Sequence, residues 1–304
     1  MIMTRAGFLT CLAGAALLAA PLSAQQDEPD AQGDDTIVVT GQTEKPPSRV
    51  VNRQARAITE TRGDLLHSPL ARIEDRLCPG VLGLRRDAAE LMIDRIRWNA
   101  ERLGMWMADD ANCAPNLIVA FVDDGKAAIA ELERNRSWLF NSLTLPERRA
   151  LLAEDGPVRV WSTTAMKTVT GMPVPRRESL DRPPVVQMNA AHSKIYINVR
   201  EDITQVVVLF DREKARGKTV IQLADYATMR GFARTKPAEA GAALDTVLAL
   251  FDESAEPPGG MTDFDVAYLR SLYEGMPNLR GMSKVLGVNS ELSDLLEEKT
   301  EAQE

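Results

Sequence analysis

The chain has 304 residues, of which 44% are apolar and 26% are charged, a balance typical of globular proteins. Its formal net charge of −8 disfavours a partner with a phosphate backbone, so no nucleic-acid partner is expected. The length suits one medium-sized domain with appendages.

Residues 1–24 have the layout of a secretory signal peptide. Arg5 precedes an apolar run that ends in small residues at Ala24. This run is too short, and too rich in alanine and glycine, to favour a membrane-spanning helix. We therefore expect cleavage after Ala24, export to the periplasm or beyond it, and no transmembrane segment in the mature chain.

Residues 25–68 are polar, charged and proline-containing, which predicts a disordered tether. Within it, Thr36–Gln42 reads TIVVTGQ and resembles the segment that follows the signal peptide in many TonB-dependent outer-membrane receptors of Gram-negative bacteria. The chain is too short to hold such a receptor's barrel. The resemblance implies an extended peptide that adds to the sheet edge of a partner protein. The alternative is an ordinary disordered tail.

We expect a single α+β domain over residues 69–290 and a polar, acidic tail over residues 291–304. Apolar spacing predicts an amphipathic helix within 85–107 and a buried strand over 116–122. The next helix is expected to begin at Asp123 or Asp124. Further strands are expected at 158–164, 194–199 and 203–211, and helices near 220–233, 238–252 and 263–274. This order predicts a mixed sheet followed by a helical C-terminal half.

Two cysteines, Cys78 and Cys113, remain after Cys11 leaves with the signal peptide. In an oxidising compartment an isolated pair predicts a disulfide. Closing this loop stabilises the fold by ~4 kcal/mol in the chain-entropy treatment. Two buried free thiols are the alternative.

The helix near 220–233 follows a segment that reads RGKT at Arg216–Thr219. A phosphate-binding loop would need glycine where Arg212 stands, which argues against a nucleotide site. Thr219 and Gln222 instead fit a capping box at a helix start. Because the helix is mostly apolar, we expect it to be central and buried.

The same helix resembles the H-E-x-x-H-x-x-G-x-x-H signature of metzincin proteases. Gly231 matches the glycine and Asp225 stands at the glutamate, whereas the three zinc-ligand positions hold Ala224, Thr228 and Arg234. A strand precedes the helix, as in zincins. Further along the chain, GGMTDFDVAYLRSLYEG resembles the methionine turn and final helix of that family, at Met261, Thr262, Asp265, Leu269, Leu272 and Tyr273.

The resemblance spans residues 115–275 and implies a zincin-like domain without its zinc ligands. Thr262 and Asp265 also fit a capping box, which explains part of the likeness by local structure. The alternative is an unrelated α+β domain in which an alanine-rich helix is simply buried.

Histidine supply limits the possible chemistry, because the chain has only His67 and His192. A catalytic zinc site needs at least two imidazoles, or one imidazole with thiolates, so we expect no metal and no other cofactor. A cysteine–histidine nucleophile fails for the same reason. A serine–histidine–acid site would depend on His192, and no G-x-S-x-G motif accompanies it. His192 is more typical of a hydrogen-bonded residue at a strand edge.

Carboxylates are the remaining candidates for catalysis. Asp123 and Asp124 follow a strand end, where α/β proteins often place site residues. Asp225 lies in an apolar helix and, if buried, is expected to pair with Arg230 or Arg234.

Three functions remain. The first is an exported, non-catalytic binding or scaffold protein. The second is a metal-independent hydrolase that uses Asp225 or the pair Asp123 and Asp124. The third is an accessory protein of a TonB-dependent receptor that acts through Thr36–Gln42.

Overall fold

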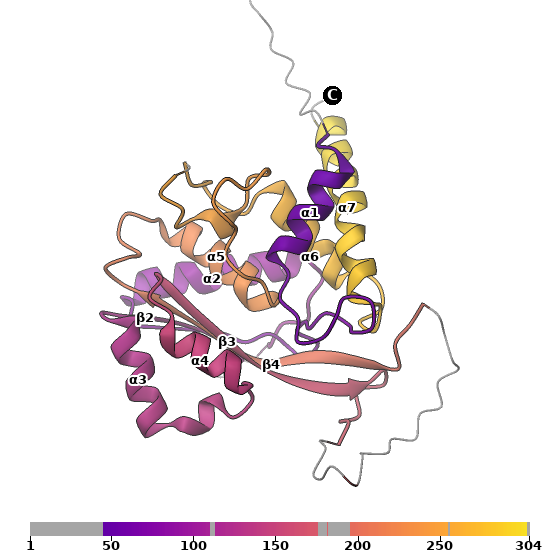
Figure 1. The fold of residues 1–304 in the computed structure, drawn as a ribbon. Coiled ribbons are helices and arrows are strands. Elements are labelled where there is room, and N and C mark those ends of the chain that lie inside the picture. Colours follow the sequence, from indigo (N-terminus) through magenta and orange to yellow (C-terminus); the bar gives the residue numbers. More distant parts are fainter. Residues whose placement is uncertain (1–44, 110–112, 176–180, 182–194, 255, 303–304) are drawn as a thin grey trace, which may run out of the picture. The chain divides into compact units, whose positions relative to one another are not determined.

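The computed structural model describes residues 45–109, 113–175, 181, 195–254 and 256–302 (Figure 1). The expected signal peptide, Thr36–Gln42 and His192 lie outside the described residues. No helix in the described part of the chain has the length and apolar character needed to cross a membrane.

The described strands form one mixed sheet in the order β1-β2-β4-β3. β1, β2 and β4 are parallel, and β3 lies antiparallel to β4 at the edge of the sheet. Apolar residues at alternate positions of β2 and β4 are buried, and this explains why these two strands are central. The strands span Pro79–Leu82 (β1), Leu117–Val122 (β2), Val158–Thr168 (β3) and Val199–Asp211 (β4).

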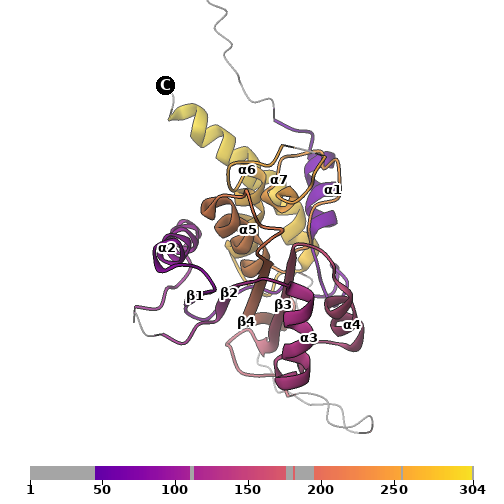
Figure 2. The same ribbon diagram turned by 90° about the vertical axis from the view of Figure 1, so that its left-hand side faces the viewer.

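Helices cover both faces of the sheet, and the α+β prediction is confirmed (Figure 2). One face packs against α2 and α5 in the larger core, and the other packs against α3 and α4 in a smaller core. α6 and α7 pack against each other, and α1 lies beside α7 (Figure 1). The helices are α1 Ser48–Ile58, α2 Arg86–Arg102, α3 Gly125–Asn135, α4 Leu145–Ala153, α5 Val220–Phe232, α6 Asp263–Tyr273 and α7 Gly281–Glu301; Ser137–Phe140 and Val247–Ala249 are short 3-10 helices.

α5 is the central helix that its sequence predicts, since every residue from Gln222 to Phe232 is buried. Thr219 and Gln222 form the predicted capping box at its start. Gly231 lies directly over β2, where an added Cβ would approach Leu117 Cδ1 to 2.6 Å. A side chain at position 231 would therefore push the helix away from the sheet.

The tether prediction is wrong for residues 48–58, which form α1. Val51, Ala55 and Ile58 lie at helical spacing and are buried. Gln54 anchors the helix by exchanging hydrogen bonds of 2.7 and 2.8 Å with the backbone of Leu244. The arginines and other polar residues between these positions lower the average hydropathy, and this composition conceals the apolar stripe.

Three further expectations at the level of elements fail. α7 continues to Glu301 through the expected tail, because Leu292 and Leu295 are buried. Residues 238–252 form no long helix; Gly241 has a φ of +74° there, which interrupts helical geometry. β4 begins only at Val199, so the described residues 195–198 do not form the strand expected over 194–199.

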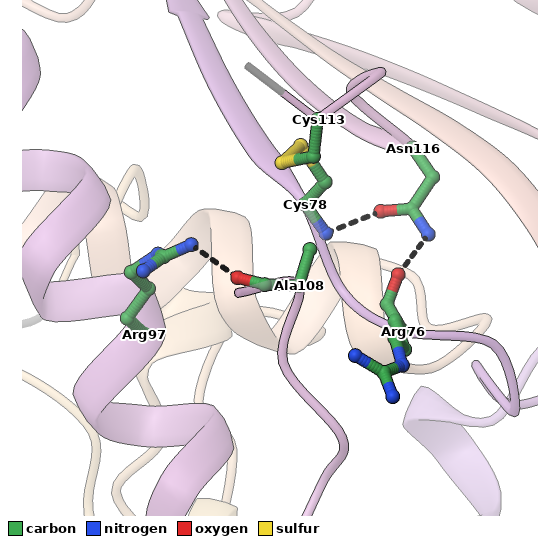
Figure 3. Close-up of a disulfide and its surroundings, with 6 residues drawn as sticks. All are labelled: Arg76, Cys78, Arg97, Ala108, Cys113 and Asn116. Atoms are coloured by element: carbon green, nitrogen blue, oxygen red, sulfur yellow. Dashed lines mark hydrogen bonds between the residues drawn. A yellow bond between two sulfur atoms is a disulfide. The ribbon is translucent and has the colours of Figure 1, made fainter. Parts of the chain in front are cut away.

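Cys78 and Cys113 form the predicted disulfide (Figure 3). The bond joins the chain just before β1 to the chain just before β2. Asn116 supports the same junction, since its side chain accepts a 2.8 Å hydrogen bond from the Cys78 amide and donates one of 2.9 Å to the Arg76 carbonyl. Such a bond fits a protein that folds in an oxidising compartment.

Candidate functional site

A cavity of about 520 Å³ opens along the outer edge of β3. Its volume falls within the usual range of ligand sites. One wall is α4, the floor is the last turns of α5, and the opposite wall is the chain from Ala233 to Asp252. The charged side chains of the lining are Glu60, Glu147, Glu154, Asp252, Arg159, Arg230, Arg234 and Lys236.

β3 presents its backbone to this cavity. The Asp211 amide donates a 2.9 Å hydrogen bond to the Pro157 carbonyl, and the register pairs Val158 with Phe210 and Val160 with Val208. In such a ladder, alternate residues bond to the neighbouring strand, so residues 158 and 160 direct their amides and carbonyls outward. No backbone group of another described residue pairs with these outward groups. β3 therefore offers an open sheet edge to a ligand.

The floor of the cavity carries Tyr226 and Arg230, one turn apart on α5. Tyr226 is fixed by an edge-on contact with Phe251, with ring centroids 5.3 Å apart. Its hydroxyl accepts a 3.2 Å hydrogen bond from Arg230 Nη1. Arg230 is only 9% exposed, its Nε has no hydrogen-bond partner, and no carboxylate of a described residue forms an ion pair with it. The floor thus holds a buried positive charge without a negative partner.

An ion-pair cluster closes one end of the cavity. Arg234 Nη2 contacts Glu60 at 2.6 Å and Glu147 at 2.8 Å, and Arg62 Nε contacts Glu147 at 2.9 Å. Burial raises the pKa of Glu147, but hydrogen bonds from Arg62, the Thr144 amide and Arg234 outweigh it and lower the pKa to about 2. Glu147 is therefore ionised at every physiological pH.

Three other charged groups of the lining, those of Glu154, Asp252 and Arg159, are engaged locally. Glu154 accepts a 2.7 Å hydrogen bond from the Gly156 amide, and Asp252 accepts one of 2.9 Å from the Ser254 amide. Arg159 donates to the carbonyls of Glu154 and Gly156, both from its own neighbourhood. Arg230 differs from these three because, among the described residues, its guanidinium donates only to the neutral hydroxyl of Tyr226.

Asp225 does not line the cavity. It is fully buried, and Arg95 of α2 donates two hydrogen bonds of 2.7 Å to its carboxylate. Asn99 Nδ2 and the Met261 amide donate two more, each of 2.8 Å. The expected pairing of Asp225 with Arg230 or Arg234 is wrong. Five residues turn an α-helix by roughly 140° beyond a full turn, so Asp225 and Arg230 point in different directions.

Asp123 and Asp124 also lie outside the cavity lining. Asp124 caps α3, as predicted, and accepts 2.9 Å hydrogen bonds from the amides of Lys126 and Ala127. The Ala127 amide is the main cause of its lowered pKa. Asp123 is exposed and pairs with Arg212. No hydrogen bond or ion pair between described residues joins either acid to Asp225.

The three residues at the zinc-ligand positions of the metzincin signature do not share one environment. Ala224 and Thr228 are fully buried, and only Arg234 reaches the cavity. His67 is exposed beside Asp64. Across the described ranges, no group of three or more histidine, cysteine or acidic residues could hold a metal ion.

Sequence reasoning did not single out Tyr226, and it treated Arg230 only as a partner for Asp225. The available signal was a tyrosine and an arginine four residues apart in an otherwise apolar helix, which places both on one face. Comparisons with protein-family models, with curated proteins and with solved structures find no match to this chain.

Proposed function

We propose that this protein is an exported, non-catalytic binding protein that takes up an extended polypeptide segment along the edge of β3. The observation that carries the proposal is the open edge itself, which lines a cavity of about 520 Å³. Adding a strand to an exposed edge is a common mode of peptide recognition, because backbone hydrogen bonds supply affinity and side-chain pockets supply selectivity.

Binding is favoured over hydrolysis by the position of the acids. Asp225 uses its carboxylate to join α2, α5 and the chain before α6. A general acid or base must lie within hydrogen-bond reach of the bound substrate. Neither Asp225 nor Asp123 nor Asp124 lines the cavity.

We also propose that the domain is a zincin-like fold that retains no zinc ligands. Supporting features are the order of β4 and α5 and the contact between the Met261 amide and Asp225, which ties the proposed methionine turn to the helix. Export, with the periplasm as the destination, is supported by the disulfide between Cys78 and Cys113. A role beside an outer-membrane receptor depends on Thr36–Gln42, which lies outside the described residues.

The test is to remove one outward backbone donor of β3. In Val160→Pro the missing amide faces the cavity, so the β3–β4 ladder keeps its hydrogen bonds. Val160→Thr is the matched control, since it retains the amide and the branched side chain. Random heptapeptides displayed on phage are selected on the immobilised mature protein, and the enriched peptides are measured by fluorescence anisotropy.

We expect enriched peptides to bind the wild type and Val160→Thr alike, and to lose at least tenfold in affinity with Val160→Pro. Circular dichroism verifies that both variants are folded. The proposal is overturned if no peptide is enriched, or if binding is indifferent to Val160→Pro. It is also overturned if the wild type and Val160→Thr are dimers and Val160→Pro is a monomer, since a second copy of the chain would then occupy the edge of β3.

A further inference from the structure

Arg230 is a buried cation whose environment lacks a full negative charge. It is 9% exposed and its Nε has no partner. The neutral Tyr226 hydroxyl accepts from Nη1, and the Tyr226 ring lies 5.9 Å from the guanidinium carbon. The C-terminal carbonyls of α5 add only a partial charge. A buried charge of this kind normally has a counter-ion. The cavity would therefore accommodate a negatively charged group beside Arg230.

The acids of the lining do not supply that charge. Glu60 and Glu147 both pair with Arg234, and Glu147 pairs with Arg62 as well. Glu154 and Asp252 accept hydrogen bonds from neighbouring amides. All four carboxylates of the lining are therefore engaged elsewhere, whereas Arg230 remains available.

The sheet geometry determines which side chain of a bound segment reaches Arg230. Val158 and Val160 belong to the core layer that contains α5, whereas Trp161 belongs to the layer that contains α3 and α4. Residues directly opposite one another on paired strands point to the same face of the sheet. A ligand residue opposite Val160 would therefore project toward α5, the helix that carries Arg230.

Resting on the proposed function, we propose that Arg230 selects for a carboxylate in the bound polypeptide, at the position that faces α5. The carboxylate is either an aspartate or glutamate side chain or the C-terminal carboxylate of the segment. A guanidinium holds a carboxylate through charge-assisted hydrogen bonds, and Arg230 lines the cavity in which the bound segment would lie.

The experiment uses three synthetic pentapeptides and the mature protein. The first is acetyl-Thr-Val-Glu-Val-Thr-amide, and the second has glutamine in place of glutamate. The third is the glutamine peptide with a free C-terminal carboxylate instead of the amide. Affinities are measured by NMR titration for the wild type, Arg230→Gln, Arg230→Lys and Arg212→Gln. Arg212 is an exposed arginine outside the cavity lining, so Arg212→Gln controls for the change in net charge.

We expect the wild type to bind at least one carboxylate-bearing peptide roughly ten- to a hundredfold more tightly than the blocked glutamine peptide. Arg230→Gln should bind all three peptides equally, Arg230→Lys should keep part of the preference, and Arg212→Gln should keep all of it. Which peptide gains distinguishes a side-chain carboxylate from a terminal one.

The two proposals fail in different ways. If all three peptides bind the wild type equally and Val160→Pro weakens them all, strand addition stands and carboxylate selection is overturned. If the preference persists in a folded Arg230→Gln protein, Arg230 is not its source and this inference is overturned. If none of the peptides binds the wild type, both proposals are contradicted.

Discussion

Asp225 is a fully buried carboxylate in α5 that accepts four hydrogen bonds. Its carboxylate accepts from Arg95, Asn99 and the Met261 amide, and so connects α2, α5 and the chain before α6. Arg95 also stacks on the Trp98 ring, with its guanidinium carbon 4.3 Å from the ring centroid. The ion pair between Arg95 and Asp225 therefore belongs to a larger hydrogen-bond network. Its loss would weaken the packing of α2, α5 and the chain before α6 together.

Asp225→Asn should destabilise the fold by ~3 kcal/mol or more, because Arg95 loses the partner of a mostly buried ion pair. Urea unfolding followed by circular dichroism measures this change. Asp123→Asn is the control, since its ion pair is exposed and should contribute little. An unchanged or raised stability of Asp225→Asn would contradict the structural role and favour an active-site role instead.

At the scale of elements, Gly231 shows how closely α5 approaches the sheet. A methyl group there would approach Leu117 Cδ1 to 2.6 Å, and Leu117 is fully buried on β2. The gain of up to ~1 kcal/mol in helix propensity from alanine is smaller than the ~1–3 kcal/mol that overpacking costs. Gly231→Ala should therefore lower the midpoint of thermal unfolding.

A double-mutant cycle tests the cause of this effect. Leu117→Ala removes the atoms that the new methyl group would strike. In that background, Gly231→Ala should be neutral or stabilising, because it fills part of the cavity and favours the helix. An equal loss of stability in both backgrounds would show that the contact with Leu117 is not the reason.

The elements that could be predicted are those whose apolar residues are continuous or regularly spaced. β2, β4 and α5 belong to this group, and the capping boxes at Thr219 and Thr262 fixed the starts of two helices. α1 was missed because its buried residues stand among arginines. The segment 238–252 was assigned to a helix although its Gly241 needs a positive φ. Local composition thus predicts most elements but not their interruptions.

The cavity belongs to the scale of the whole molecule, and sequence patterns could not locate it. Glu60, Glu147, Arg230 and Asp252 come from four separate parts of the chain and meet only in the folded protein. Which face of α5 reaches the cavity depends on where β3 and α4 pack. The sequence could therefore place Arg230 on a buried helix, but it named Arg230 or Arg234 as the partner of Asp225, whereas that partner is Arg95 of α2.

The ion-pair cluster around Glu147 joins three parts of the chain that are distant in sequence, so the stability of the fold should fall at low pH. Glu147 belongs to α4, Arg62 follows α1 and Arg234 follows α5. The pKa of Glu147 is lowered from 4.5 to about 2 in the folded protein. A lowered folded-state pKa means that the unfolded chain binds the proton first. The stabilisation is therefore complete above pH 4.5 and is lost as the pH falls toward 2.

Glu147→Gln should be less stable than the wild type by about 2 kcal/mol at pH 7, after allowance for the solvent that screens part of the carboxylate. This difference should shrink between pH 4.5 and pH 2, because the wild type loses the same charge by protonation. Urea unfolding at intervals of pH measures it. Glu90→Gln is the control, since Glu90 pairs only with Arg86 on the exposed side of α2 and should show little pH-dependent difference. A difference between wild type and Glu147→Gln that stays constant from pH 7 to pH 2 would mean that the ionisation of Glu147 does not hold these three parts together.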